Sequence, residues 1–187
     1  MLTKYPRIPL IASNIQLFAE IINNIYSQIF LNDICPVNIS KNQLKILTTL
    51  FISDDKTASA ISDILRVSRP AITQQVDKLL KLNLVSRETD SVDRRSVNIS
   101  LTKRGQDIVN TYEEYILARH ANVLNYFTYE ERDCFNNGLE KFIDLCLENE
   151  DNLEILCLNC EGHLKKFCKI QHHKHICHLN QKQTLAQ

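Results

Sequence analysis

Apolar residues recur at helical spacing along most of this chain. Between residues 10 and 31 they alternate at intervals of four and three, which places them on one face of a helix. Further long helices are predicted over 103–126 and 129–150. The apolar positions of the three segments are Ile11, Ile15, Phe18, Ile22, Ile25 and Ile29; Ile108, Tyr112, Tyr115, Val123 and Tyr126; and Phe135, Leu139, Phe142, Cys146 and Leu153.

Shorter helices are predicted between these long ones, over 41–51, 58–65 and 68–82. In the last of these, Pro70 falls in the first turn, where its missing N–H costs little. Cys35-Pro36 is expected to end the first long helix, and Asn83 to take the left-handed conformation that ends the helix before it. The predicted N-terminal caps are Ser40 with Gln43, Thr57, Ser68, Thr102, and Thr128 with Glu131.

Two alternating segments, 84–88 and 96–101, are predicted to be strands. The residues between them, 89–95, are polar and basic and suit the tip of a β-hairpin. Two short helices joined by the Arg66–Ser68 turn and followed by a basic hairpin are typical of a winged helix-turn-helix. The expected fold is therefore mainly α with a small β-hairpin wing, flanked by long helices.

Charge is unevenly distributed along the 187 residues, although the net charge is zero. Residues 66–104 carry nine Lys/Arg and four Asp/Glu, a net of +5, whereas residues 105–156 carry three and twelve, a net of −9. The positive segment coincides with the predicted helix-turn-helix and wing. A basic patch there is a candidate for contact with phosphates, although charge alone also fits a solvated face.

The predicted helix over 68–82 has the composition of a DNA-reading helix. Burial of Ile72, Val76 and Leu79 would turn its polar residues outward, and a major groove admits one such helix. Gln74 can pair with adenine, and the Thr73 methyl can pack on a thymine. Arginines at a hairpin tip suit a narrow minor groove. The predicted DNA-binding residues are Ser68, Arg69, Pro70, Thr73, Gln74, Lys78, Arg94 and Arg95.

Residues 43–105 resemble the MarR family of transcriptional regulators. The resemblance rests on Ser68-Arg69-Pro70-Ala71-Ile72-Thr73, on Leu84-Val85-Ser86-Arg87, and on the segment from Asp93 to Gly105, which matches the pattern D-x-R…LT-x-x-G. Asn83 departs from the glycine usual there. The resemblance implies that Arg95 enters the minor groove, that Asp93 shapes the wing, and that the outer helices build a homodimer. Because a two-fold dimer presents two DNA-reading helices, we expect it to bind pseudo-palindromic double-stranded DNA.

With its flanking helices, the resemblance covers residues 10–150. We expect a winged-helix domain over 10–150, with a DNA-binding core at 36–102 and dimerisation helices at 10–31 and 103–150, followed by an extension over 152–187. The expected function is that of a sequence-specific DNA-binding transcriptional regulator, acting as a homodimeric repressor that responds to metal or redox state at a C-terminal Cys/His site. The rival interpretation is a metal- or redox-binding interaction module whose winged helix docks protein.

The extension contains four of the seven cysteines and five of the six histidines. Its cysteines are spaced C-x2-C-x7-C-x8-C, and a C-x2-C pair can bring two thiolates onto one metal. A tetrahedral zinc site is expected, with an iron–sulfur cluster as the alternative. Thiol redox chemistry, another soft metal, or a tail without metal stay open. The predicted ligands are Cys157, Cys160, Cys168 and Cys177, with His163, His172, His173, His175 and His178 as alternates.

The other cysteines carry weaker signals. Cys146 lies on an apolar stripe and is expected to be a core thiol, and Cys35 is expected to be structural. Cys134 lies near a helix start, a position typical of reactive thiols. His120 is expected to be a surface or packed residue. No catalytic constellation, apolar membrane span or signal peptide is evident, so a non-enzymatic, cytoplasmic protein without a membrane partner is expected.

Overall fold

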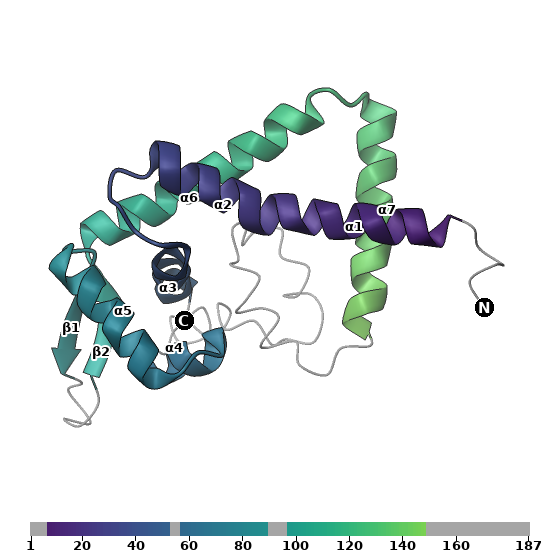
Figure 1. Cartoon of the computed structure of the whole chain (residues 1–187). Helices are drawn as coiled ribbons and strands as arrows, with labels where there is room; N and C mark the ends of the chain where they lie inside the picture. The colour runs from purple at the N-terminus through teal and green to yellow at the C-terminus, as the bar shows by residue number, and fades with distance from the viewer. Residues whose placement is uncertain (1–6, 53–56, 90–96, 149–187) are drawn as a thin grey trace, which may run out of the picture. The chain divides into compact units, whose positions relative to one another are not determined.

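The computed structural model describes residues 7–52, 57–89 and 97–148 (Figure 1). It is mainly helical with one two-stranded hairpin, which confirms the predicted fold class. The chain divides into two compact units, residues 1–41 and 42–187. The elements in order are α1 (Ile8–Glu20), η2 (Ile21–Ile25), α2 (Tyr26–Ile29), η3 (Phe30–Ile34), α3 (Lys41–Ile52), α4 (Ala58–Leu65), α5 (Arg69–Lys81), β1 (Val85–Thr89), β2 (Val97–Leu101), α6 (Lys103–Leu124) and α7 (Tyr129–Glu148).

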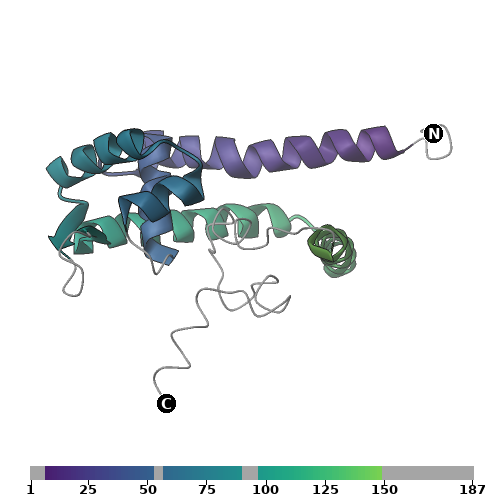
Figure 2. The ribbon, with the colours of Figure 1, turned by 90° about the horizontal axis from the view of Figure 1, so that it is seen from below.

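The first unit is a continuous helical run from α1 through η3, in which η2 and η3 are short π-helical segments (Figure 2). The run ends at Cys35, whose backbone is extended because a residue before proline avoids the helical region. The helix predicted over 10–31 is confirmed and extends three residues further. Tyr26 and Phe30 are buried, but Ile11, Ile15 and Phe18 of the predicted apolar face are exposed. Most of α1 therefore presents an apolar surface.

In the second unit, α3 is buried along most of its length, with Leu44, Ile46, Leu47 and Leu50 at 3% exposure or less. Helix α4 packs against α5, and both helices contact the hairpin, α4 through β2 and α5 through β1. Strands β1 and β2 pair antiparallel from Val85 opposite Leu101 to Thr89 opposite Val97. An isolated bridge joins Thr57 to Asn98. The helix-turn-helix and hairpin of the prediction are thus present.

Helix α6 runs from the base of the hairpin to the turn before α7 (Figure 1). Its first half supplies Ile108, Val109, Tyr112 and Ile116 to the core. Beyond that point the predicted face leaves the core: Val123 is half-exposed, and Tyr126, just past the helix end, is 93% exposed.

Helix α7 carries a largely exposed apolar face. Phe135 and Phe142 are exposed, although the Phe135 ring stacks on Phe127 with centroids 6.1 Å apart. Cys146 is exposed as well, so the prediction of a core thiol is wrong. Its neighbour Leu147 is buried instead, because a shift of one residue rotates a helical position by about 100°.

Among the described residues, no helix is both long enough and apolar enough to cross a membrane.

Candidate nucleic-acid interface

Helix α5 separates its residues into a buried and an exposed face. Ile72, Val76 and Leu79 are at most 2% exposed, as predicted. Every polar residue predicted to face outward from α5 is exposed, and Ser68, which precedes the helix, is exposed as well. The structure therefore brings these predicted DNA-binding residues to one helix: Ser68, Arg69, Pro70, Thr73, Gln74 and Lys78.

The turn before α5 differs from the prediction in one respect. Ser68 occupies the N-cap position with an extended backbone, but its side chain makes no capping hydrogen bond, so that part of the prediction is wrong. Pro70 lies in the first turn and removes one of the amides that a cap usually binds. At the end of α4, Arg66 adopts a left-handed conformation with φ of 52°. Its amide donates to Asp63, and the Val67 amide donates to Ser62.

The C-terminal end of α5 is closed by its own backbone. The Leu84 amide donates to the Leu79 carbonyl (3.0 Å), and the Asn83 amide donates to Leu80 (2.9 Å). Asn83 has φ of 55°, the left-handed conformation predicted for it. This is a Schellman motif, and its apolar contact is available because Leu79 and Leu84 are both fully buried. The motif fixes the path from α5 into β1.

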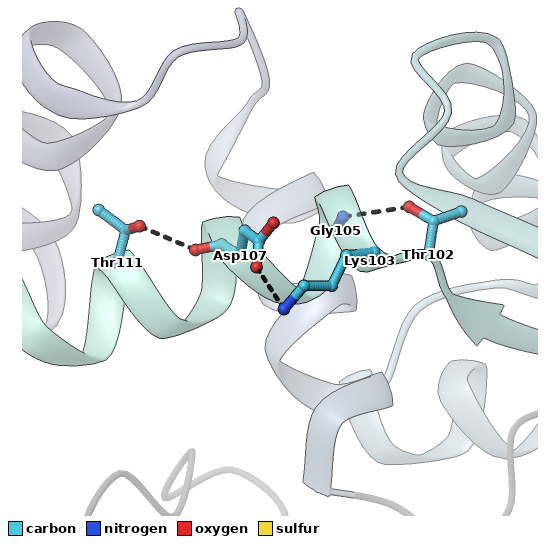
Figure 3. Close-up of polar contacts among 5 residues, drawn as sticks. All are labelled: Thr102, Lys103, Gly105, Asp107 and Thr111. Atoms are coloured by element: carbon cyan, nitrogen blue, oxygen red, sulfur yellow. Dashed lines mark hydrogen bonds and ion pairs between the residues drawn. The ribbon is translucent and has the colours of Figure 1, made fainter.

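Residues at the start of α6 bind the backbone of that same path. The Thr102 hydroxyl donates to the Asn83 carbonyl (2.8 Å), the Thr102 amide donates to Leu84 (3.1 Å), and the Arg104 guanidinium donates to Leu82 (3.2 Å). The Thr102 hydroxyl also accepts from the Gly105 amide (3.1 Å) and so caps α6, as predicted (Figure 3).

Gly105 completes this contact, which we call the α5–α6 junction (residues 82–84 with Thr102, Arg104 and Gly105). A Cβ at Gly105 would lie 2.0 Å from the Leu84 carbonyl oxygen, so only glycine allows α6 to approach so closely. The LT-x-x-G pattern in the sequence therefore contains Thr102 and Gly105, two of the residues that form this junction. Its consequence is that the start of α6 is joined to the end of α5 through several hydrogen bonds to main-chain carbonyls.

An ion pair joins α5 to the hairpin. Arg87 of β1 lies 2.8 Å from Asp77 of α5. The sequence predicted that Asp77 faces outward but assigned no role to Arg87 beyond the family resemblance. The only available signal was that both residues belong to the basic segment, and their pairing depends on how β1 packs on α5.

The remaining predicted DNA-binding residues, Arg94 and Arg95, lie outside the described residues. So does Asp93, to which the resemblance assigns a role in shaping the wing. The strands that lead to this segment are described, and the last pair before it is Thr89 with Val97.

All nine predicted metal ligands, from Cys157 to His178, also lie outside the described residues. Within residues 7–52, 57–89 and 97–148, no three His, Cys, Asp or Glu side chains are grouped to hold a metal ion. Cys134 is exposed, and Cys35 is half-buried. Burial raises the pKa of the Cys35 thiol, while a hydrogen bond from the Val37 backbone opposes this shift. Cys35 is thus held mainly as the neutral thiol, which fits a structural role.

Comparison with known proteins agrees with this geometry. Residues 39–97 match the sequence model of the MarR family. Among solved structures, a MarR family protein from Bacillus stearothermophilus is 24% identical, with a TM-score of 0.62 over 74% of this chain and 94% of that one. Streptococcus pneumoniae FabT in complex with DNA is 21% identical, with a TM-score of 0.60 over 78% and 99%.

A third similar structure is a mutant of Staphylococcus aureus MepR bound to an oligodeoxyribonucleotide. It is 19% identical, with a TM-score of 0.58 over 72% of this chain and 96% of that one. The resemblance to the MarR family is confirmed by the match over residues 39–97, and the winged-helix fold by the structural neighbours.

Proposed function

We propose that this chain, which has the fold of MarR-family transcriptional regulators, binds double-stranded DNA as a homodimer. In this proposal it acts in the cytoplasm as a repressor of transcription and catalyses no reaction. The observation that carries the proposal is the division of α5: its apolar residues are buried, while Arg69, Thr73, Gln74 and Lys78 share an exposed surface. A groove-binding helix needs that arrangement, since base edges are read by hydrogen-bonding side chains. FabT and MepR, whose folds are similar, have been solved with nucleic acid bound.

The same surface argues against the rival function, in which the winged helix docks a protein. The cores of protein interfaces are enriched in aromatic residues and methionine and depleted in charged residues such as lysine and aspartate. The exposed side chains of α5 include Asp77 and Lys78, and none is aromatic. DNA is therefore the partner that this helix fits better.

The test is a genomic selection with purified protein, followed by titration of the selected duplex. Gln74→Ala should weaken binding by about 1–3 kcal/mol at particular base pairs, whereas Lys78→Ala should weaken binding to all sequences and reduce its salt dependence. Gln106→Ala, at an exposed glutamine of α6, is the matched control and should change nothing. Failure of the wild-type protein to enrich any sequence, at any salt concentration, would contradict the proposal.

Dimerisation is the second part of the proposal. Helix α1 exposes Leu10, Ile11 and Leu17, and α7 exposes Phe142 and Leu145. Surfaces this apolar on long helices are typical of partner contacts, and a two-fold partner would place two recognition helices about 34 Å apart, one turn of DNA. We therefore assign α1 and α7 to the dimer interface.

We further propose that the Cys/His-rich extension binds zinc, or alternatively an iron–sulfur cluster, and makes DNA binding respond to metal or redox state. The support is the spacing of Cys157, Cys160, Cys168 and Cys177, whose thiolates suit either group. Because the extension follows the last described helix, α7, a ligand there would act on the dimer rather than directly on α5.

Metal analysis of protein purified without oxygen tests the site itself. Operator affinity is then measured for the wild type with and without metal, and for Cys157→Ser/Cys160→Ser. A sensor should give a difference of about 5- to 150-fold between the metal-bound and metal-free protein. Equal affinities in all three would show that any bound metal is structural only.

A further inference from the structure

The Asp77–Arg87 ion pair connects α5 with β1, two elements of the proposed DNA-binding region. Asp77 lies on α5, beside Val76, which is fully buried, so its backbone is fixed by the core. Arg87 lies on β1 and is paired with Ile99 of β2, which is also buried. Because side chains alternate along a strand, Arg87 shares a strand face with the buried Val85. Both ends of the pair are therefore held by regular, packed structure.

The position of Asp77 places this pair within the proposed DNA-binding surface. Asp77 is four residues after Thr73 and three after Gln74, so the three side chains lie on one helix face. It is the single acidic residue in the sequence of α5. A carboxylate on this face would repel phosphates, and Arg87, at 2.8 Å, neutralises it. A helix that only needed positive charge would not carry Asp77.

The pair contributes little to folding, since both side chains are substantially exposed, at 37% for Arg87 and 50% for Asp77. Ion pairs of this kind have small effects on stability. Its effect is geometric: it links α5 to β1 two residues before β1 ends at Thr89, where the segment with Arg94 and Arg95 begins. The orientation of the recognition helix relative to the base of the wing then depends on this link.

We infer that Asp77 and Arg87 are positioning residues that set the preference for operator over other DNA, by fixing α5 relative to the wing. This inference rests on the proposed DNA-binding function. The pair acts on specificity because base contacts need a defined helix orientation, whereas phosphate contacts tolerate a change in it. It does so without adding net charge to the surface.

The experiment uses full-length protein, the best duplex from the genomic selection, and a random-sequence duplex of equal length. The neutral variant Asp77→Asn/Arg87→Gln removes the pair without changing net charge. It should bind random DNA as the wild type does and bind the operator about three- to tenfold more weakly. Asp77→Asn alone should raise binding to random DNA and lower the operator-to-random ratio. The exchange Asp77→Arg/Arg87→Asp should restore much of the ratio.

A matched control is the Lys103–Asp107 pair on α6, which is also exposed and has a distance of 3.0 Å (Figure 3). Lys103→Gln/Asp107→Asn removes an ion pair at the same net charge and should leave the operator-to-random ratio unchanged. Thermal unfolding midpoints of all variants should stay within a few degrees of the wild type, which separates positioning from loss of fold.

Two outcomes would overturn the inference while leaving the proposed function intact. One is an unchanged ratio in Asp77→Asn/Arg87→Gln, with the wild type selective. The other is additivity, in which Asp77→Asn strengthens and Arg87→Gln weakens binding to both duplexes equally; Arg87 would then be a phosphate contact. If the wild type binds no DNA selectively, the proposed function fails first.

Discussion

At Gly105, α6 packs directly on the Leu84 carbonyl that follows α5, and among the described non-glycine residues the backbone turns left-handed at Arg66 and Asn83. Each position is constrained by backbone geometry rather than by side-chain contacts. At Gly105 the constraint is steric, because the Leu84 carbonyl occupies the space of a Cβ. At Arg66 and Asn83 it is conformational, since residues with a Cβ favour negative φ. Small substitutions at these positions should therefore have large effects.

Gly105→Ala should lower the free energy of unfolding by about 1–3 kcal/mol, because the added methyl forces α6 away from Leu84. Gly138→Ala is the matched control: nothing lies within 4 Å of a Cβ there, so alanine should stabilise α7 by about 0.5–1 kcal/mol. Urea denaturation of both variants measures the difference. Equal stability of the two variants would mean that the α5–α6 junction accommodates the added methyl group without a loss of stability.

Arg66→Gly should raise the free energy of unfolding by about 1 kcal/mol, since glycine takes the left-handed conformation without strain. Arg66→Ala removes the same charge but keeps the Cβ, so it isolates the backbone effect. The two variants should differ in denaturation midpoint and bind the operator with equal affinity. Equal midpoints would contradict the argument.

At the scale of elements, most helix caps that the structure describes could be predicted from local sequence, with the side-chain cap of Ser68 as the exception. The Thr57 and Thr102 caps form, and Thr128 with Glu131 makes both bonds of a capping box, at 3.2 and 2.8 Å. Such contacts join residues three apart, so local sequence specifies them. The Asp77–Arg87 pair could not be predicted, because it depends on the packing of β1 against α5.

The exposure of side chains on the long helices was only partly predictable, because it too depends on how the helices pack. Periodicity shows which residues share a face, but it does not show whether that face enters the core. The faces of α1 and α7 are helical as predicted and stay exposed, and Cys146 is exposed with them. Within α6, the same periodic face is buried at Ile108 and exposed at Val123, because only its first half meets the core.

Thr128→Ala should destabilise α7 by about 1 kcal/mol, since it removes one bond of the capping box and leaves the Glu131 amide without its partner. Thr111→Ala offers the comparison. That hydroxyl bonds only to the Asp107 carbonyl within α6, and alanine favours helix, so the change should be neutral or slightly stabilising (Figure 3). Hydrogen exchange of the first-turn amides of α7 reports the loss locally. Unaltered exchange in Thr128→Ala would show that the cap does not matter.

At the scale of the whole molecule, a single copy of the chain leaves many large apolar side chains exposed to solvent. Among them, Leu10, Ile11 and Leu17 of α1 and Phe142 and Leu145 of α7 lie outside the helix-turn-helix, in segments that the sequence predicted to be dimerisation helices. The dimer and the Cys/His-rich extension stay predictions, since one depends on a second copy of the chain and the other lies outside the described residues.

Ile11→Glu should convert the dimer to monomers and weaken operator binding by at least about tenfold, because a dimer contacts two half-sites at once. Ile11 is 53% exposed, so the charge should not disturb the fold of a single chain. Gln16→Glu adds the same charge away from the apolar stripe of α1 and should stay dimeric. Sedimentation velocity distinguishes the two, and a dimeric Ile11→Glu variant would remove α1 from the interface.

The α5–α6 junction has a consequence for how such a protein can change its target. Thr102 and Arg104 bind main-chain carbonyls at 82–84, so these attachments do not depend on which side chains α5 exposes. Under the proposed function, substitutions at Thr73 and Gln74 can therefore alter the DNA sequence that is read while the hydrogen bonds that hold the end of α5 stay the same. After gene duplication, or in a laboratory exchange of the exposed residues of α5, a copy can therefore acquire a new operator without compensating substitutions at the α5–α6 junction. Asp77 is the exception on that face, because its exchange requires a matching change at Arg87.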